Sequence, residues 1–455
     1  MTCRFQPYDV ETPFLLPPAL QDWLPEEHLA YFLTDAVAQL DLAALYDYYR
    51  ADGKGQTPYH PRMMVTVLLY AYCTGVRSSR QIEKKCVEDL AFRVLAGNQQ
   101  PDHSALCRFR ERHSLALEEL FLQVLRLCAE AGLVRAGLLA LDGVKLKANA
   151  ALSANRTLVG LRKEIQKLLA EAQAEDRRED ELFGAERRGD EVPAELRKRA
   201  ARRVRLTECR RRLEEEAQAA EAAQAAKLAA RAAKEAAQGG KVRGRKPLPP
   251  AAKVDAEAKA NVTDPESRIM KTRTGYVQGY NAQAVCNEAQ IIVAADVTGE
   301  ENDKRQLAPL LEQARHNLKA AGAKGRARAA LADAGYWSAP NACWGGRWGP
   351  ELFIATQKDW KQRAALRRQA VPLGRRPKNL SVRELMDRKL LTKRGRHLYR
   401  KRGEMIEAVF GQVTVVQDGK QCMRRGQAAA RSEWRLTCTG HNLLKLWRSG
   451  RAQWN

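Results

Sequence analysis

A short apolar run that ends in a single carboxylate constrains the fold of this chain more than any other feature. Residues 138–146 read Leu-Leu-Ala-Leu-Asp-Gly-Val-Lys-Leu, with Gly137 before the run and Gly143 directly after Asp142. A run of this length bounded by glycines is typical of a buried β-strand. Asp142 is then expected at the end of the strand, where a buried carboxylate needs an opposite charge or a metal ion to compensate it.

The same arrangement occurs a second time at residues 329–336, where Asp333 follows the apolar run Ala-Ala-Leu-Ala. The chain carries 78 lysines and arginines against 54 aspartates and glutamates, a formal net charge of +24. Such an excess predicts a polyanionic partner, most simply nucleic acid. Two strand-end acids in so basic a chain therefore predict a divalent-cation site that acts on phosphate.

Composition and periodicity divide the chain into several regions, because 455 residues are too many for one ordinary core. Residues 1–136 are expected to form a helical domain, and residues 137–154 to carry the first strand of an α/β core. Residues 155–260, rich in Ala, Glu, Arg, Lys and Leu, are typical of a long helical insertion that ends in a basic linker at 239–250. Residues 261–455 complete the core. Further strands are expected at 275–285, 290–297 and 351–356, and helices at 302–320 and 404–413.

The helical domain carries a candidate DNA-reading element. Short helices joined by tight turns end in a segment with Arg108, Arg110 and Arg112, which is compatible with a helix-turn-helix motif. An ordinary helical bundle with a solvated basic face is the alternative. On the first interpretation, Arg108 and Arg110 contact DNA.

Zinc binding and membrane association are not predicted. His103, Cys107 and His113 imitate part of a zinc site, but no second closely spaced pair accompanies them. The ten cysteines include no Cys-x-x-Cys pair and no signal peptide precedes them, so we expect reduced thiols in a cytosolic protein. No apolar stretch approaches the roughly 20 residues of a membrane span.

Two-metal phosphoryl transfer requires several carboxylates around two divalent ions about 3.5–4 Å apart. Asp142 and Asp333 are the natural first two ligands, since strands place them rigidly and Mg²⁺ prefers hard oxygen ligands. A helix is expected to supply the third, and Glu404 and Glu407 are the candidates. These two are three residues apart and share a helix face, so spacing alone does not choose between them.

Other acids remain open as ligands. Asp264 and Glu266 lie in a Thr-Asp-Pro-Glu-Ser-Arg segment, and Asp296 ends an apolar run. A turn is the simpler role for Asp264, because Pro265 biases the preceding residue away from helix. A solvent-facing strand end is the simpler role for Asp296.

A series of short motifs runs in order along nearly the whole chain. They read PYHPRM at 58–63, GVRSSRQI at 75–82, PDHS at 101–104, LDGVKLKANA at 141–150, TDPESRIM at 263–270, VQGYNAQ at 277–283, ADAGYW at 332–337 and HNLLKL at 441–446. Together they resemble the bacterial insertion-sequence DDE transposases that have a helical N-terminal transposase domain. The resemblance implies a ribonuclease H-like core with a mixed sheet.

The resemblance also implies roles for particular residues. Asp142 matches the first acid of the family, on the first strand, and Asp333 matches the second, at the end of the fourth strand. The third lies in a Tyr-x-x-Arg-x-x-x-x-Glu pattern, matched by Tyr399, Arg402 and Glu407. The pattern selects Glu407 over Glu404.

The same family implies Mg²⁺ as the cofactor, with Mn²⁺ as a substitute, and double-stranded DNA as the partner. Tyr399 and Arg402 are expected to contact phosphate near the cleaved bond, and Lys145 joins them as an expected DNA contact. A homodimer is expected on the element's two ends. The expected location is the bacterial cytoplasm, at the nucleoid.

Some positions depart from the family pattern. Ala408 stands where the family usually has proline, Thr414 where it has Lys or Arg, and residues 415–425 differ as well. The main hypothesis is a transposase that binds inverted repeats, cuts the ends and joins them to target DNA. A DNA-binding copy without catalysis is the alternative, and a nuclease that cuts without joining is a third.

Overall fold

A mixed β-sheet forms the centre of the protein. The computed structural model describes residues 19–49, 57–183, 194–240, 258–272, 274–344, 349–452 and 454. Within them, the sheet has six strands: β1 (Leu138–Lys147), β4 (Arg268–Thr272), β5 (Gly275–Asn287), β6 (Ile292–Thr298), β7 (Ala329–Ala332) and β8 (Glu351–Ile354). The first four residues of β1, all of β7 and most of β6 are buried, which explains the continuous apolar runs in the sequence.

The order of the strands places the two acid-bearing strands next to each other. β1 pairs antiparallel with β5 on one side and parallel with β7 on the other, and β7 pairs parallel with β8. β4 and β6 both pair antiparallel with β5, one with each half of that strand. Because β7 pairs with the first residues of β1 only, the carboxyl end of β7 lies beside the middle of β1, where Asp142 stands.

Short helices form the N-terminal domain. They are η1 (Leu20–Trp23), α1 (Leu29–Ala38), α2 (Ala43–Tyr46), α3 (Pro61–Cys73), α4 (Ser79–Glu88), α5 (Leu90–Leu95), α6 (His103–Arg112) and α7 (Ser114–Glu130). The α6 helix begins after Asp102, whose side chain accepts the backbone N–H of Ala105 at 2.7 Å, because this cap satisfies a donor that the first turn leaves free.

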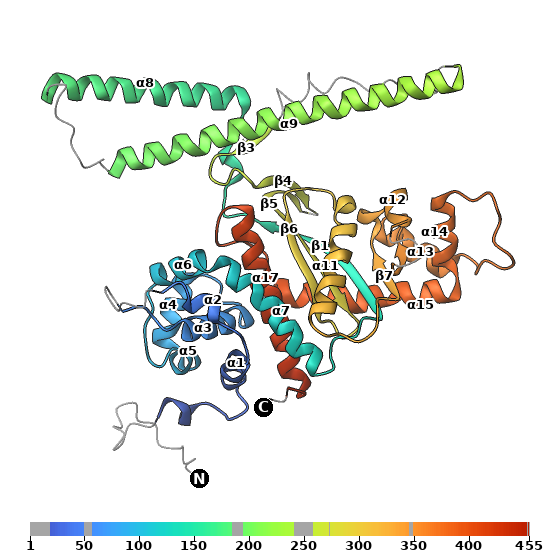
Figure 1. Cartoon of the computed structure of the whole chain (residues 1–455), viewed down its shortest axis with the longest axis horizontal. Helices are drawn as coiled ribbons and strands as arrows, with labels where there is room; N and C mark the ends of the chain where they lie inside the picture. The colour runs from blue at the N-terminus through green and yellow to red at the C-terminus, as the bar shows by residue number, and fades with distance from the viewer. Residues whose placement is uncertain are drawn as a thin grey trace, which may run out of the picture.

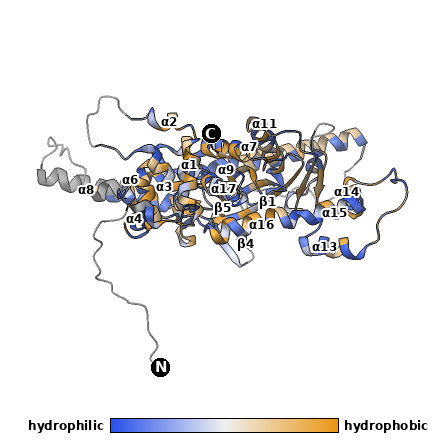
Figure 2. Ribbon diagram, turned by 90° about the horizontal axis from the view of Figure 1, so that it is seen from below, coloured by the Kyte–Doolittle hydropathy of each residue, from blue (hydrophilic) through white to orange (hydrophobic). Residues whose placement is uncertain are grey.

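The last helix, α17 (Gln427–Ser449), joins this domain to the sheet. It runs between the N-terminal helices and the strands, beside α7 (Figure 1). Most of its residues from Ala430 to Leu446 are buried, and it packs against α3, α7 and β6. A helix that is buried on nearly all sides packs into a core and not onto a surface. Through α17, the N-terminal helices and the sheet share one continuous hydrophobic core. Figure 2 shows hydrophobic residues concentrated on the strands and on the helices packed around them.

Helices that follow the strands complete the core. They are η3 (Asp303–Arg305), α11 (Leu307–Ala320), η4 (Ala334–Tyr336), α12 (Ala339–Ala342), α13 (Asp359–Arg368), α14 (Val382–Leu391), α15 (Lys393–Arg402), η5 (Gly403–Glu407), α16 (Ala408–Gly411) and η6 (Gln412–Val416). The helix expected at 302–320 is divided, with α11 starting at Leu307. Pro309 fits this start, since proline lacks an N–H and is tolerated in the first turn of a helix.

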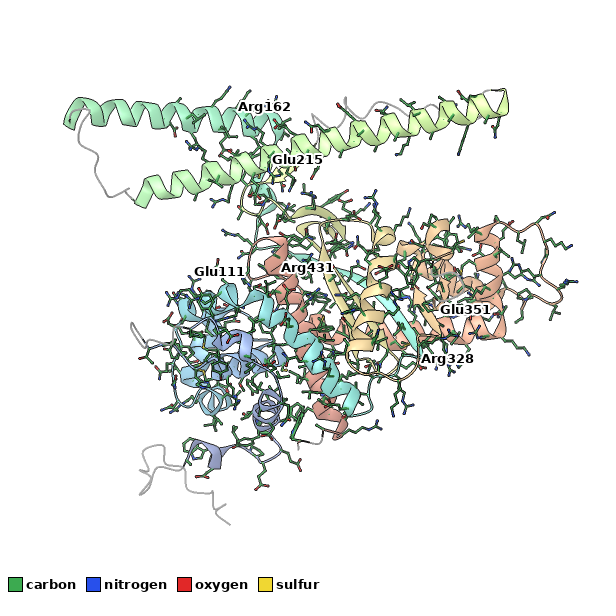
Figure 3. All side chains as sticks on the ribbon, in the orientation of Figure 1. Glu111, Arg162, Glu215, Arg328, Glu351 and Arg431 are labelled. Atoms are coloured by element: carbon green, nitrogen blue, oxygen red, sulfur yellow. The ribbon has the colours of Figure 1, made fainter. Side chains whose placement is uncertain are left out.

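The insertion consists of two long helices that stand away from the rest of the protein (Figure 1). They are α8 (Leu158–Phe183) and α9 (Ala194–Gln238). A small strand pair, β2 (Asn155–Thr157) with β3 (Lys259–Asn261), connects them to the core, next to the turn η2 (Leu152–Ala154). The start of α8 packs against the middle of α9 in a separate small cluster that includes Leu161, Leu206 and Leu213. Charged side chains such as Arg162 and Glu215 stand along both helices in Figure 3.

The predicted fold class is confirmed. A helical N-terminal region precedes a mixed α/β core, and a helical insertion follows the first core strand. The linker predicted at 239–250 lies, after its first two glycines, outside the described residues. In the part of the chain that the structure describes, no helix is both long and apolar enough to cross a membrane.

Candidate active site

Asp142 and Asp333 lie next to each other where β7 ends beside the middle of β1. The expectation that Asp142 ends its strand is wrong, because β1 continues past it to Lys147 and stays paired with β5. The last residues of β1 and β7 that pair with each other are Ala140 and Leu331, and each acid follows its paired residue by two positions. Residues at equal distances along two parallel strands are neighbours. The sheet thus brings together the two acids that the apolar runs identified in the sequence.

Backbone amides hold one oxygen of each acid. Oδ1 of Asp142 accepts the N–H of Gly143 at 2.8 Å, and Oδ1 of Asp333 accepts the N–H of Gly335 at 2.9 Å. The side chain of Asp142 is 22% exposed, and Asp333 is also half-buried. Both carboxylates are rigidly placed and still reach the surface.

The ionisation of this pair is disfavoured. Burial raises the pKa of Asp142 to about 7, while Arg402 lowers it and Asp333 raises it further. Burial also raises the pKa of Asp333, against the lowering effects of Arg402 and of the Gly335 N–H. Two neighbouring carboxylates oppose each other's charge, so a nearby cation stabilises both.

Arg402 reaches these acids from the end of α15. Its side chain is 7% exposed, and Nη1 lies 3.4 Å from Oδ2 of Asp142 and 3.6 Å from Oε1 of Glu407. Arg402 and Glu407 are five residues apart and would point to different sides of a regular α-helix. The π-helical turn η5 between them bonds residue i to residue i+5, which brings the two side chains into line.

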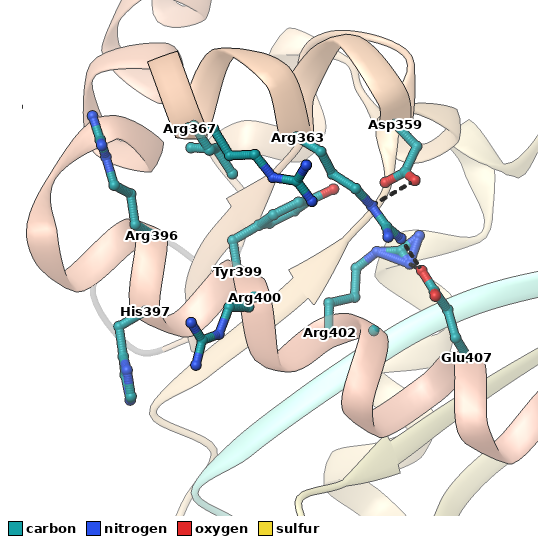
Figure 4. Close-up of a pocket in the computed structure, with 11 residues that line it drawn as sticks. Asp359, Arg363, Arg367, Arg396, His397, Tyr399, Arg400, Arg402 and Glu407 are labelled. Carbon is teal, nitrogen blue, oxygen red and sulfur yellow. Dashed lines mark hydrogen bonds and ion pairs between the residues drawn. The ribbon is translucent and has the colours of Figure 1, made fainter. Parts of the chain in front are cut away.

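Glu407 is also bound by an arginine that the sequence did not single out. Oε1 of Glu407 lies 2.6 Å from Nη2 of Arg363 on α13, and Nε of Arg363 lies 2.9 Å from Asp359 (Figure 4). Glu404 has a different environment, since it is 69% exposed and 3.9 Å from Arg400. The helical segment therefore presents Glu407, and not Glu404, to Arg402.

A cationic pocket lies beside the two acids. Its volume is about 590 Å³, and Asp359, Tyr399 and Glu407 are among its lining residues. Five arginines also line it: Arg363, Arg367, Arg396, Arg400 and Arg402 (Figure 4). A pocket with this charge, at the edge of a pair of carboxylates, fits the phosphates of a nucleic acid.

Tyr399 and Lys145, two expected DNA contacts, both lie at this site. Tyr399 is 5% exposed, and its hydroxyl has no hydrogen-bond partner among the described residues. Burial raises its pKa, so the hydroxyl stays protonated. Nζ of Lys145 donates to the carbonyl of Glu301 at 2.7 Å and lies 3.5 Å from Oδ1 of Asp303.

The other two expected DNA contacts, Arg108 and Arg110, have different environments. Arg108 is exposed on α6 and lines a hollow with Tyr59 and Arg112. Arg110 is 2% exposed and donates to the hydroxyl of Tyr72 at 3.3 Å and to the carbonyl of Arg77 at 3.1 Å. In this conformation Arg110 supports the interior of the domain and does not reach the surface.

A further carboxylate, Asp303, which no sequence pattern indicated, also lies close to Asp142 and Asp333. It follows β6 in the short turn η3 and accepts hydrogen bonds from Asn281 and Gln283. An acid at the start of a helix normally indicates only a favourable charge near the N-terminus. The one feature of the sequence that could have indicated Asp303 is its position shortly after the buried strand β6.

The donor set fits a divalent cation in its chemistry. Within the described parts of the chain, no three His, Cys, Asp or Glu side chains converge closely enough to hold a metal ion. Arg402 lies against Asp142, and Arg363 holds Glu407, so arginines compensate these carboxylates in the structure. Carboxylate oxygens are nevertheless the ligands that Mg²⁺ prefers, and burial of an adjacent acidic pair favours a compensating cation.

The alternative ligands lie in other environments. Asp264 is fully buried and accepts the hydroxyl of Tyr280 at 2.8 Å, which fits the role in a turn. Asp296 is 45% exposed and pairs with Arg431 at 2.7 Å. His103, from the imitated zinc pattern, lies 2.9 Å from Glu83.

Two protein-family models match the chain. One, described as Transposase domain (DUF772), matches residues 18–112, and the other, described as Transposase DDE domain, matches residues 361–447. The first covers most of the helical N-terminal domain. The second runs from α13 to α17 and includes Tyr399, Arg402 and Glu407. No curated protein and no solved structure matches the chain.

Proposed function

We propose that this chain, a transposase with a DUF772 transposase domain and a DDE transposase domain, cuts DNA at the ends of its own element. It would then join the new 3′ ends to target DNA. The observation that carries this proposal is the position of Asp142 on β1 beside Asp333 at the end of β7, with Arg402 3.4 Å from Asp142. Strand cleavage and joining are both phosphoryl transfers, which two divalent ions held by protein ligands can catalyse.

Asp142, Asp333 and Glu407 would hold the divalent ions, Mg²⁺ or Mn²⁺ in its place. When bound, such ions lower the pKa of the attacking water or 3′-hydroxyl and stabilise the leaving oxygen. Asp142 and Asp333 would be placed by the sheet. Glu407 would join them after release from Arg363, whose ion pair with it is partly exposed and therefore weak.

The residues of the cationic pocket would position the DNA. Arg402 bridges Asp142 and Glu407 at 3.4 and 3.6 Å, and its guanidinium matches the geometry of a phosphate as well as that of a carboxylate. A buried hydroxyl without a partner is costly, and a phosphate oxygen would satisfy that of Tyr399. These two side chains would thus hold the scissile phosphate beside Asp142.

The N-terminal domain would bind the inverted repeat, with Arg108 on its surface. Contacts from lysines and arginines to phosphates would give an affinity that falls as the salt concentration rises. Because two ends must be joined in one event, we expect a dimer on DNA.

A cleavage assay tests the proposal. A labelled duplex that carries the element's end is incubated with Mg²⁺ or Mn²⁺ and with wild type, Asp142→Asn or Asp296→Asn. Asp296 serves as the matched control because it is also a strand acid but pairs with Arg431. We expect wild type and the control to cut at the repeat boundary, and Asp142→Asn to bind without cutting.

Other results would point to the alternatives. Equal binding by all three proteins without cutting under either ion would contradict the proposal and favour a DNA-binding protein without catalysis. Cutting without joined products would favour a nuclease.

A further inference from the structure

We propose that Asp303 is a further carboxylate of the metal site and binds the divalent ion together with Asp333. This inference rests on the proposed function. It arises from the way in which Asp303 is held and from the space that two glycines leave around it.

One oxygen of Asp303 is fixed by a set of donors. Oδ1 accepts the side-chain amides of Asn281 at 2.7 Å and of Gln283 at 2.8 Å, and it lies 3.5 Å from Nζ of Lys145. Asn281 and Gln283 are fully buried on β5, next to β1. Rigid neighbours therefore determine the position of this carboxylate.

The second oxygen of Asp303 lies beside Gly335, as does an oxygen of Asp333. A Cβ on Gly335 would lie 2.9 Å from Oδ2 of Asp303 and 3.0 Å from Oδ1 of Asp333, so the two oxygens flank the same small space. No hydrogen bond to Oδ2 of Asp303 is found among the described residues, and the side chain is 22% exposed. This oxygen is free to accept a ligand.

Gly143 makes room on the other side. A Cβ there would lie 2.4 Å from Nε2 of Gln283 and 3.1 Å from Oδ1 of Asp303. Glycine at this position lets the Asp303 network approach the backbone beside Asp142. The absence of a side chain at Gly143 and Gly335 thus leaves room for Asp303 beside Asp142 on β1 and Asp333 at the end of β7.

This arrangement is the one that a metal-binding carboxylate requires. Ligating carboxylates are themselves held by hydrogen bonds from a surrounding shell, which orients the free oxygen and tunes the metal. Here Asn281, Gln283 and Lys145 would form that shell. If Asp303 only fastened the η3 turn to β5, its second oxygen would have no need to face another acid.

The substitution Asp303→Asn separates these two roles. An amide keeps an oxygen that accepts from Asn281 and Gln283, but it removes the charge that binds a cation. We would measure Mn²⁺ binding by electron paramagnetic resonance of the free ion, with full-length wild type, Asp303→Asn, Asp142→Asn and Asp296→Asn. Thermal unfolding of each protein reports on folding.

We expect Asp303→Asn to weaken Mn²⁺ binding by about tenfold or more, and Asp296→Asn to bind as wild type does. Wild-type binding by Asp303→Asn, together with loss in Asp142→Asn, would overturn the inference and leave the proposed function intact. Absence of Mn²⁺ binding by wild type would contradict both.

A second measurement on wild type does not depend on how the variants fold. Fe²⁺ with ascorbate and peroxide cleaves the polypeptide backbone near a bound metal ion. We expect cuts near residues 142, 303 and 333. Cuts near 142 and 333 without one near 303 would overturn the inference.

Discussion

At the scale of single residues, the environment of Asp142 disfavours the charged form of its carboxyl group. Burial and Asp333 raise its pKa, whereas Arg402 lowers it, and the balance lies at about 7. Arg402 is itself buried, and its positive charge is favoured by Asp142, Asp333 and Glu407. The free protein thus holds a carboxylate near its titration point, in a place where catalysis would need it charged.

The pKa of Asp142 predicts a pH dependence of stability in the metal-free protein. An unfolded aspartate loses its proton near pH ~4, but folded Asp142 keeps it until about pH 7. Between these values the folded state binds more protons, so the contribution of this residue to the free energy of unfolding falls as the pH rises. We expect Asp142→Asn to lose less stability than wild type from pH 5 to pH 7.5.

Urea unfolding in EDTA at both pH values measures this effect. The difference between the two proteins should be on the order of a few kcal/mol, since each unit of pKa corresponds to about 1.4 kcal/mol. Parallel pH profiles for wild type and Asp142→Asn would show that the folded environment does not shift this acid.

At the scale of elements, a buried ion pair joins the N-terminal domain to α17. Arg77 and Glu433 are 2% and 1% exposed and lie 3.5 Å apart. Arg77 also donates to the carbonyls of Asp418 and Gln421, and Glu433 accepts the N–H of Met423 at 2.8 Å. Arg77 and Glu433 therefore both hydrogen-bond to residues 415–425, the segment that departs most from the family pattern.

Removal of Arg77 should be strongly destabilising. Arg77→Ala leaves the charge of Glu433 buried without its partner, and we expect the free energy of unfolding to fall by about 3–5 kcal/mol. Arg80→Ala is the matched control, since Arg80 is exposed on the following helix and should change stability by less than about 0.5 kcal/mol.

Urea unfolding again provides the measurement. A double variant, Arg77→Met with Glu433→Met, should be more stable than Arg77→Ala, because it leaves neither charge unpaired. Equal stability of Arg77→Ala and Arg80→Ala would contradict the structural role of the pair.

At the scale of the whole molecule, the insertion is a separate module. Its two ends lie side by side in the strand pair β2–β3, where Thr157 is opposite Lys259. Its base has its own small hydrophobic cluster. Many of its arginines are paired with glutamates on the same surface, as Arg211 is with Glu215 at 2.7 Å. These ion pairs offset part of the positive charge that the insertion carries.

We expect the core to fold without this module. Replacement of residues 158–258 by a short Gly/Ser turn should keep the cooperative unfolding transition and Mn²⁺ binding, because the sheet and α17 make their main contacts elsewhere. Affinity for the element's end should fall by less than about tenfold, or roughly 1.4 kcal/mol. Loss of the unfolding transition would show that α8 and α9 are part of the core, and a larger loss of affinity would show that they bind the DNA end.

The sequence by itself determined most strands of the core sheet, the helical insertion and the two acids that follow apolar runs. These features are local, because a buried strand must be a continuous apolar run and a solvated helix must be polar on its surface. The run before Asp142 and the run before Asp333 therefore predicted strands that the structure confirms. The sequence did not indicate β4, and it put Asp142 at a strand end, whereas Asp142 lies in the middle of β1.

Only the tertiary structure decided which neighbours each side chain meets. Arg108 and Arg110 are indistinguishable by composition, yet one is exposed and the other is bonded to Tyr72. Asp303 resembles an ordinary acid at a helix start until β5 places Asn281 and Gln283 against it. Such contacts join residues far apart in the chain. The sequence pattern shows which face of a helix or strand is buried, but it does not show which residues pack against that face.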